Sequence, residues 1–148
     1  MIEETLTHRL VLPRDANHYG TLYAGSLLSL ALEAGYAAAY RATGPRANLV
    51  LKRVLDLRCY QPVRVGEVVS IRGAEVHRAR AHVVVALYGV PLAGRYRPWV
   101  DGLMQFVQVD AQGFPEPLER EPPVEAPTLD PPWVDLRRRA LRLLGIRG

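Results

Sequence analysis

An asparagine, a histidine and a single carboxylate stand out early in the chain. Residues 17–42 read NHYGTLYAGSLLSLALEAGYAAAYRA, so Asn17 and His18 precede a long apolar stretch in which Glu33 is the only acid. An imidazole or a carboxylate can take a proton from water, and an amide can hold a polar group in place. Taken alone, Asn17 and His18 are also ordinary turn and surface residues, so a chemical role depends on what places them near Glu33.

A helix from about Ala24 to Arg41 must position Glu33. Ala, Leu and Glu dominate this segment, no proline interrupts it, and residues 43–45 (Thr-Gly-Pro) supply a terminating glycine and proline. Helical spacing predicts one partly buried stripe along it, made of Ser26, Ser29, Glu33, Tyr36 and Tyr40. This stripe either carries a general base or is only the polar edge of the helix, with Glu33 bonded to a tyrosine or to an arginine such as Arg53.

Five β-strands are predicted around this helix. They cover residues 5–12, 48–60, 68–76, 81–88 and 99–109, which alternate or are rich in β-branched and aromatic side chains. The last four follow one another without an intervening helix, which indicates an antiparallel sheet. One sheet cannot cover a helix that is apolar nearly all round, so we expect a partner subunit to cover the rest and the chain to form a homo-oligomer.

The composition indicates which classes of partner and which cellular compartment to expect. The 148 residues carry a formal net charge of +4, but the arginines are spread along the chain except in the run at 137–142, and no nucleic-acid-binding motif accompanies them. We therefore expect no nucleic-acid partner. One cysteine and the absence of an apolar leader or spanning segment predict a cytoplasmic protein that does not enter a membrane. The four histidines have no metal-ligand spacing, so no metal is predicted.

Three stretches of the chain resemble the hotdog-fold acyl-CoA thioesterase superfamily. They are LVLPRDANHYGTLYAGSLLSLALEAG (10–35), YQPVRVGEVVSIRGAEV (60–76) and MQFVQVDAQGFPEPL (104–118). The resemblance implies an α+β hotdog domain over residues 1–118, in which a curled antiparallel sheet of about five strands wraps one long central helix. The residues themselves predict a proline-rich extension and then a short basic amphipathic helix at 133–144, so that residues 119–148 are expected to pack on or near the same domain.

The resemblance also implies a reaction. It is the hydrolysis of an acyl-thioester, with acyl-CoA as substrate and no separate cofactor, at a subunit interface of a homodimer or homotetramer. Asn17 would position the attacking water or the thioester, and the backbone N–H groups of Ala24 and Gly25 would bind the carbonyl oxygen at the helix N-terminus. The family places its acid at position 32, where this chain has Leu32, so the candidate base is Glu33, one residue later.

Further residues are expected to contact the acyl chain and the coenzyme A part of the substrate. Leu28 and Tyr36 are the candidates for the acyl chain, and Arg95 and Arg97 are candidates for the phosphates of coenzyme A, because guanidinium groups pair with phosphate through two hydrogen bonds.

Two other functions stay open on the sequence. Leu32 at the usual position of the acid would suit a hotdog protein that binds acyl-CoA or a fatty-acyl group without hydrolysing it. A dehydratase is the third possibility; it normally needs a histidine together with an acid, and His18 alone is placed to serve.

Overall fold

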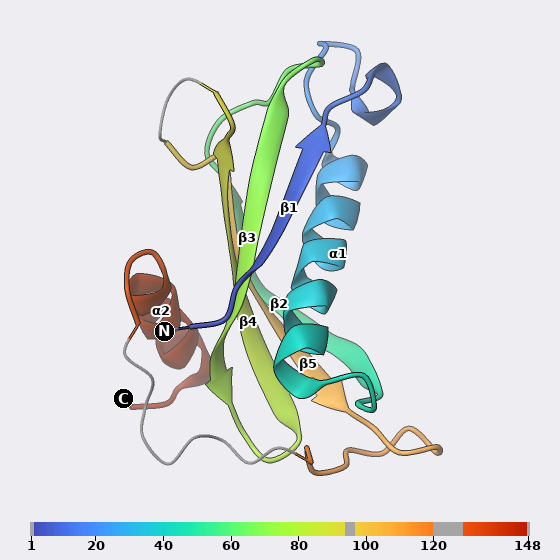
Figure 1. Ribbon diagram of the computed structural model, residues 1–148, viewed down its shortest axis with the longest axis vertical. Helices are drawn as coiled ribbons and strands as arrows, with labels where there is room; N and C mark the ends of the chain where they lie inside the picture. Colours follow the sequence, from blue (N-terminus) through green and yellow to red (C-terminus); the bar gives the residue numbers. More distant parts are fainter. Residues whose placement is uncertain (1, 94–96, 120–128, 148) are drawn as a thin grey trace.

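The computed structural model describes residues 2–93, 97–119 and 129–147. Its elements are, in chain order, β1 (Thr5–Leu10), a 3-10 turn (Pro13–Asp15), α1 (Ala24–Thr43), β2 (Leu49–Cys59), β3 (Val68–Arg78), β4 (His82–Pro91), β5 (Val100–Gln108) and α2 (Trp133–Leu144) (Figure 1). Each strand and helix predicted from the sequence is present, with ends that differ by a few residues. The helix that carries Glu33 extends to Thr43, which is two residues beyond its predicted end.

The strands form one five-stranded antiparallel sheet in the order β1-β3-β4-β5-β2. Consecutive strands β3, β4 and β5 are neighbours, as the short connections predicted. In contrast, β2 pairs with β5 at the far side of the sheet, so it does not neighbour β3, the strand that follows it in the chain. The two edge strands are therefore β1 and β2.

The long helix α1 lies along one face of the curled sheet (Figure 1). Small side chains make up most of its buried face: Ala31, Ala34, Gly35, Ala38 and Ala39. Gly73 on β3 faces this surface, where an added Cβ would lie 3.0 Å from the Cβ of Ala38. The small residues thus let helix and sheet approach closely.

The short helix α2 packs on the opposite face of the sheet (Figure 1). Its contact with the sheet is a second apolar cluster of Ala74, Val76, Val84, Ala86, Leu103, Trp133, Leu136 and Ala140. Arg138 and Arg142 on its other side are exposed. The two faces of the sheet are thus covered by different helices, and residues 120–128 of the proline-rich extension lie outside the described residues.

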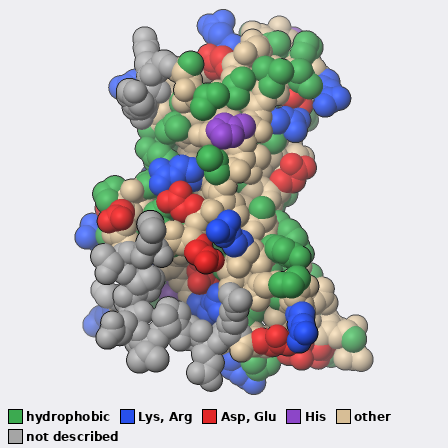
Figure 2. All heavy atoms as spheres, in the orientation of Figure 1, with side chains coloured by type: hydrophobic (Ala, Val, Ile, Leu, Met, Phe, Trp, Pro, Cys, Tyr) green, Lys and Arg blue, Asp and Glu red, His purple; other side chains and the backbone are tan. Residues whose placement is uncertain are grey.

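Charges of both signs are distributed over the surface. On the face shown in Figure 2, Lys and Arg side chains lie among Asp and Glu side chains and do not gather into one basic patch. Within the described ranges, neither helix is long and apolar enough to cross a membrane.

Gly89 on β4 lies where the sheet is packed too closely for a side chain. An added Cβ would lie 2.7 Å from Nε1 of Trp99 and 2.8 Å from the carbonyl oxygen of Ser70, two atoms that share a hydrogen bond. We expect Gly89→Ala to lower the free energy of unfolding by about 1–3 kcal/mol, measured by urea denaturation. Gly35→Ala on α1 is the comparison, because its Cβ would lie 2.6 Å from Sδ of the buried Met104. It should also lower the free energy of unfolding, but by less, since only side chains have to shift there and the helix gains propensity. Equal losses in the two variants would contradict this explanation.

Candidate active site

The first turn of α1 presents backbone donors without acceptors. Tyr23 is the N-cap and its side chain makes no capping hydrogen bond. Within the described residues, nothing accepts a hydrogen bond from the N–H groups of Ala24, Gly25 or Ser26. A helix N-terminus of this kind favours a negatively charged or strongly polarised oxygen. The two N–H groups predicted to bind a carbonyl oxygen are thus free to do so.

Gly25 is packed against the aromatic ring of Tyr23, two residues earlier in the chain. A Cβ at this position would overlap the ring of Tyr23, which itself is about half exposed. A side chain at position 25 would therefore displace the tyrosine, and glycine lets the Tyr23 ring pack against this turn.

A polar pocket of about 280 Å³ opens beside this turn. Its lining residues come from β1, the 3-10 turn and α1: Arg9, Asp15, Tyr23, Gly25, Ser26, Ser29, Leu30 and Glu33. Two residues predicted for the site, Gly25 and Glu33, are therefore brought to one pocket. Ser26 and Glu33 are seven residues apart and differ by only about 20° around the helix axis, whereas Gly25 and Glu33 differ by about 80°, so the three residues share one broad side of α1.

Glu33 is exposed and free of ion pairs. Within the described part of the chain, no hydrogen bond or salt bridge is formed by its carboxylate. The pairing with Arg53 that the sequence left open is absent, since Nε of Arg53 donates to Oε1 of Gln105 at 2.8 Å. In this single chain the Glu33 side chain is more exposed than the partly buried stripe predicted. Its carboxylate is thus open to accept a proton from a molecule in the pocket.

An apolar groove of about 660 Å³ lies further along α1 and shares the lining residue Glu33 with the polar pocket. It lies between α1 and the edge strand β2, and its lining is Leu32, Glu33, Tyr36, Ala37, Tyr40, Leu49, Val50, Leu51 and Phe106. The ring of Tyr36 meets that of Phe106 edge-on, with centroids 5.9 Å apart. Glu33 borders both the pocket and the groove, whereas Leu32 belongs to the groove.

Asn17 is used to shape the loop before α1. Its Oδ1 accepts hydrogen bonds from the N–H groups of Tyr19 at 2.9 Å and Thr21 at 3.2 Å, and its amide donates to Oγ1 of Thr21 at 3.0 Å. Asn17 does not line the polar pocket with Gly25 and Glu33. His18 also lies outside the pocket lining and packs its ring against Tyr19, with centroids 4.0 Å apart.

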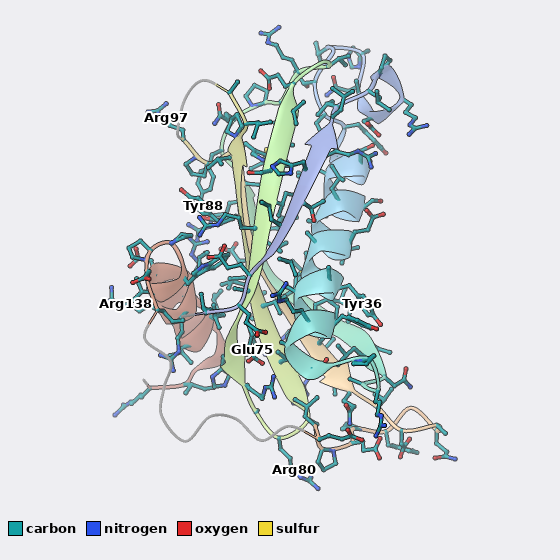
Figure 3. All side chains as sticks on the ribbon, viewed as in Figure 1. Tyr36, Glu75, Arg80, Tyr88, Arg97 and Arg138 are labelled. Atoms are coloured by element: carbon teal, nitrogen blue, oxygen red, sulfur yellow. The ribbon has the colours of Figure 1, made fainter. Side chains whose placement is uncertain are left out.

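The residues predicted to hold the ends of the substrate are dispersed in the single chain. Leu28 is exposed on α1 and is not among the residues that line the pocket or the groove. Arg97 and Tyr36 lie on opposite sides of the sheet (Figure 3). Arg95 lies outside the described residues. One chain by itself therefore brings Tyr36 to the groove but neither Leu28 nor Arg97.

Asp15 and Arg9 were not singled out from the sequence: Arg9 lies in the predicted strand 5–12, and Asp15 lies between that strand and the helix. Asp15 is buried: its Oδ2 accepts the N–H of Leu12 at 3.0 Å and its Oδ1 accepts Nη2 of Arg9 at 3.1 Å. The hydrogen bond from Leu12, assisted by Arg9, holds the pKa of Asp15 below its usual range. The available signal was an acid three residues after Leu12 and two after Pro13, a pattern typical of a capped turn.

Solved acyl-CoA thioesterases share this arrangement of helix and sheet. A hexameric acyl-CoA thioesterase in its apo form aligns with a TM-score of 0.77 and 23% identity, over 96% of this chain and 88% of that one. An acyl-CoA hydrolase from Bacillus cereus aligns with a TM-score of 0.81 and 21% identity, over 96% and 84%. This chain has the hotdog fold. The acyl-CoA hydrolase of Staphylococcus aureus was solved with butyryl coenzyme A, coenzyme A and coenzyme A disulfide. It aligns with a TM-score of 0.75 and 21% identity, over 96% of this chain and 90% of that one.

The likeness to other hotdog proteins is structural. No protein-family model matches the sequence, and no curated protein does. The TM-scores of 0.75–0.81 establish the fold, but at 21–23% identity they establish the fold alone, and this fold is shared by proteins with different activities. The reaction therefore has to be argued from the pocket.

Proposed function

We propose that this hotdog protein is an acyl-CoA thioesterase that acts at a subunit interface. The observation that carries the proposal is the polar pocket, whose lining includes both Gly25 and Ser26, with free N–H groups in the first turn of α1, and Glu33, with an unpaired carboxylate. Thioester hydrolysis needs these two elements: donors for the carbonyl oxygen and a base for water. The solved structures that share the fold are described as acyl-CoA thioesterases and hydrolases, which supports the same reaction class.

The proposed reaction begins with the thioester oxygen at the helix N-terminus. The N–H groups of Ala24 and Gly25 donate to this oxygen, and each such donor is worth about 3–4 kcal/mol in the transition state. Glu33 takes a proton from water, whose oxygen attacks the carbonyl carbon. The carbon–sulfur bond then breaks, and the thiolate of coenzyme A leaves with the proton returned from Glu33. The products are a free acid and the thiol, and no metal or further cofactor takes part.

The apolar groove is the proposed site of the acyl chain. It begins at Glu33 and continues past Tyr36 and Phe106, so a chain whose carbonyl lies in the polar pocket can extend into it. Asn17 acts through the loop that it closes before α1. Leu28 and Arg97 lie away from the groove of their own chain. We therefore propose that they, together with Arg95, contact a substrate molecule that is bound in the groove of a neighbouring subunit.

A homo-oligomer follows from the surfaces that one chain leaves open. Large apolar side chains remain exposed on α1 and on the edge strand β2: Leu28, Leu32, Tyr36, Tyr40, Val50, Leu51 and Val54. An apolar surface beside an unpaired strand edge is normally covered by a partner. Three of the similar solved thioesterases are described as hexameric, so a hexamer joins the dimer and tetramer as a candidate assembly.

A second function, binding of acyl-CoA without hydrolysis, is favoured by one observation. In the S. aureus hydrolase, the asparagine and the aspartate that were each changed to alanine are fifteen residues apart. Fifteen residues after Asn17 stands Leu32 in this chain, which cannot act as a base. The two functions therefore differ in one respect: in the thioesterase Glu33 acts as the base in place of an acid at position 32, and in the binding protein no residue does.

Release of free thiol from a panel of acyl-CoAs tests the proposal. We expect turnover above the uncatalysed rate for at least one chain length, with the free acid identified by mass spectrometry. Calorimetric binding of S-butyl-CoA, a thioether that cannot be hydrolysed, is measured in parallel. Binding without turnover of any acyl-CoA would favour the second function, and neither binding nor turnover would contradict both.

A further inference from the structure

Arg9 extends from the edge strand β1 to the first turn of α1. Leu6 and Leu10 of the same strand are exposed on its outer side. Each is an odd number of residues from Arg9, and side chains alternate sides along a strand. Arg9 therefore points to the inner side and lines the polar pocket together with Gly25 and Ser26. A residue from β1 thus reaches the helix N-terminus where the thioester oxygen is proposed to bind.

Asp15 holds this guanidinium in place. The carboxylate is buried, and its second oxygen is fixed by the N–H of Leu12, so it offers Arg9 a stationary partner. Within the described residues, this is the one hydrogen bond that Arg9 makes through its side chain, and a guanidinium has five N–H donors. The remaining donors of Arg9 are free for a molecule in the pocket.

The charges of the pocket indicate what Arg9 can bind. Arg9 is the single cation among the described residues of the lining, beside two carboxylates, Asp15 and Glu33. A phosphate with two negative charges would be repelled by this balance, and the volume of about 280 Å³ is small. A neutral carbonyl oxygen that becomes negative only in the transition state fits better, because Asp15 orients the donors of Arg9 before the charge develops.

We infer that Arg9 contacts the thioester oxygen together with the N–H groups of the first turn of α1, and that Asp15 is the positioning residue for Arg9. The inference rests on the proposed thioesterase function, and it adds a side-chain donor from β1 to the backbone donors of α1.

The variant Arg9→Met tests the inference through kcat and KM for thiol release. We expect kcat to fall about 100-fold, as for the loss of one transition-state donor, while KM changes by less than about threefold. S-butyl-CoA lacks the carbonyl, so its affinity in calorimetry should stay at the wild-type value. Arg9→Lys should recover only part of the loss, since it keeps a charge but not the fork of donors. Asp15→Asn should lower kcat with little change in KM.

The control is Arg14→Met, an exposed arginine of the same 3-10 turn that does not line the pocket and should leave kcat unchanged. Because Arg9→Met leaves Asp15 buried without its cation, thermal unfolding is compared with that of the Arg9→Met/Asp15→Asn double variant. The double variant should regain thermal stability but not kcat.

Three results would overturn the inference. Arg9→Met with wild-type kcat would exclude Arg9 while leaving the proposed function intact. Loss of S-butyl-CoA affinity equal to the loss of kcat would assign Arg9 to coenzyme A. A wild-type protein that turns over no acyl-CoA would instead remove the proposed function, and this role of Arg9 with it.

Discussion

Replacing Arg139 with methionine is expected to lower the free energy of unfolding by about 3–5 kcal/mol in urea denaturation. Arg139 connects α2 to the sheet, with Nη1 2.7 Å from Oδ1 and Nη2 3.2 Å from Oδ2 of Asp101. Asp101 is only 6% exposed, and its other contact is the Tyr60 hydroxyl, which donates to Oδ2 at 2.7 Å. The variant would leave a buried carboxylate without a cation, and burying an uncompensated charge is the large cost.

The neighbouring Arg138 is the matched control. It pairs with Asp135 at 3.2 Å on the same helix, but the side chains of both residues are more than 70% exposed. Because exposed pairs contribute little, Arg138→Met should change the free energy of unfolding by less than about 0.5 kcal/mol. Adding Asp101→Asn to Arg139→Met should recover most of the loss. Similar effects of the two single arginine variants would show that burial of Asp101 does not decide the stability of this contact.

Replacing Glu33 with glutamine is expected to lower kcat for thiol release by about 10²–10⁴-fold, the range for loss of a general base. The amide keeps the size of the side chain but cannot take a proton from water, so KM should change little. Glu116→Gln is the control, since Glu116 is exposed and its side chain makes no hydrogen bond within the described residues. Full activity of Glu33→Gln would remove Glu33 from the mechanism and leave the fold unaffected.

Exchanging the two neighbouring residues, as Leu32→Glu with Glu33→Leu, tests the position of the acid. The two side chains differ by about 100° around the helix axis, so the exchange moves the carboxylate from the border of the polar pocket into the apolar groove. We expect the exchanged variant to be as slow as Glu33→Gln in the same assay. Wild-type activity of the exchanged variant would show that position 32 reaches the thioester.

The extents of helices and strands were predictable because their signals are local. The segment that became α1 has a helix-forming composition without proline and a glycine followed by proline at its end, and α2 was predicted over the residues that it occupies. The order of the strands was not predictable in the same way. The place of β2 beside β5 depends on contacts between distant segments, such as the pairing of Leu49 with Gln108, and these leave no mark in local spacing.

The residues of the candidate site likewise fall into those that local spacing predicts and those that only tertiary contacts place. Ser26, Ser29 and Glu33 were predicted on one stripe and line one pocket, because helical periodicity alone puts them there. Asn17 was predicted beside them, but its hydrogen-bonding groups are engaged within its own loop. Arg9 went unnoticed, since only the packing of β1 along α1 brings a strand residue to the helix N-terminus.

The lone acid in the apolar helix shows most clearly what each level determines. The sequence by itself determined that a carboxylate stands at position 33 and a leucine at 32, and helical geometry sets about 100° between them. It could not determine which of the two faces the free N–H groups, because that depends on which side of α1 the sheet buries. The tertiary structure buries the side of Ala34 and Ala38 and thereby turns Glu33 to the pocket of Arg9 and Gly25, and Leu32 to the groove beside β2.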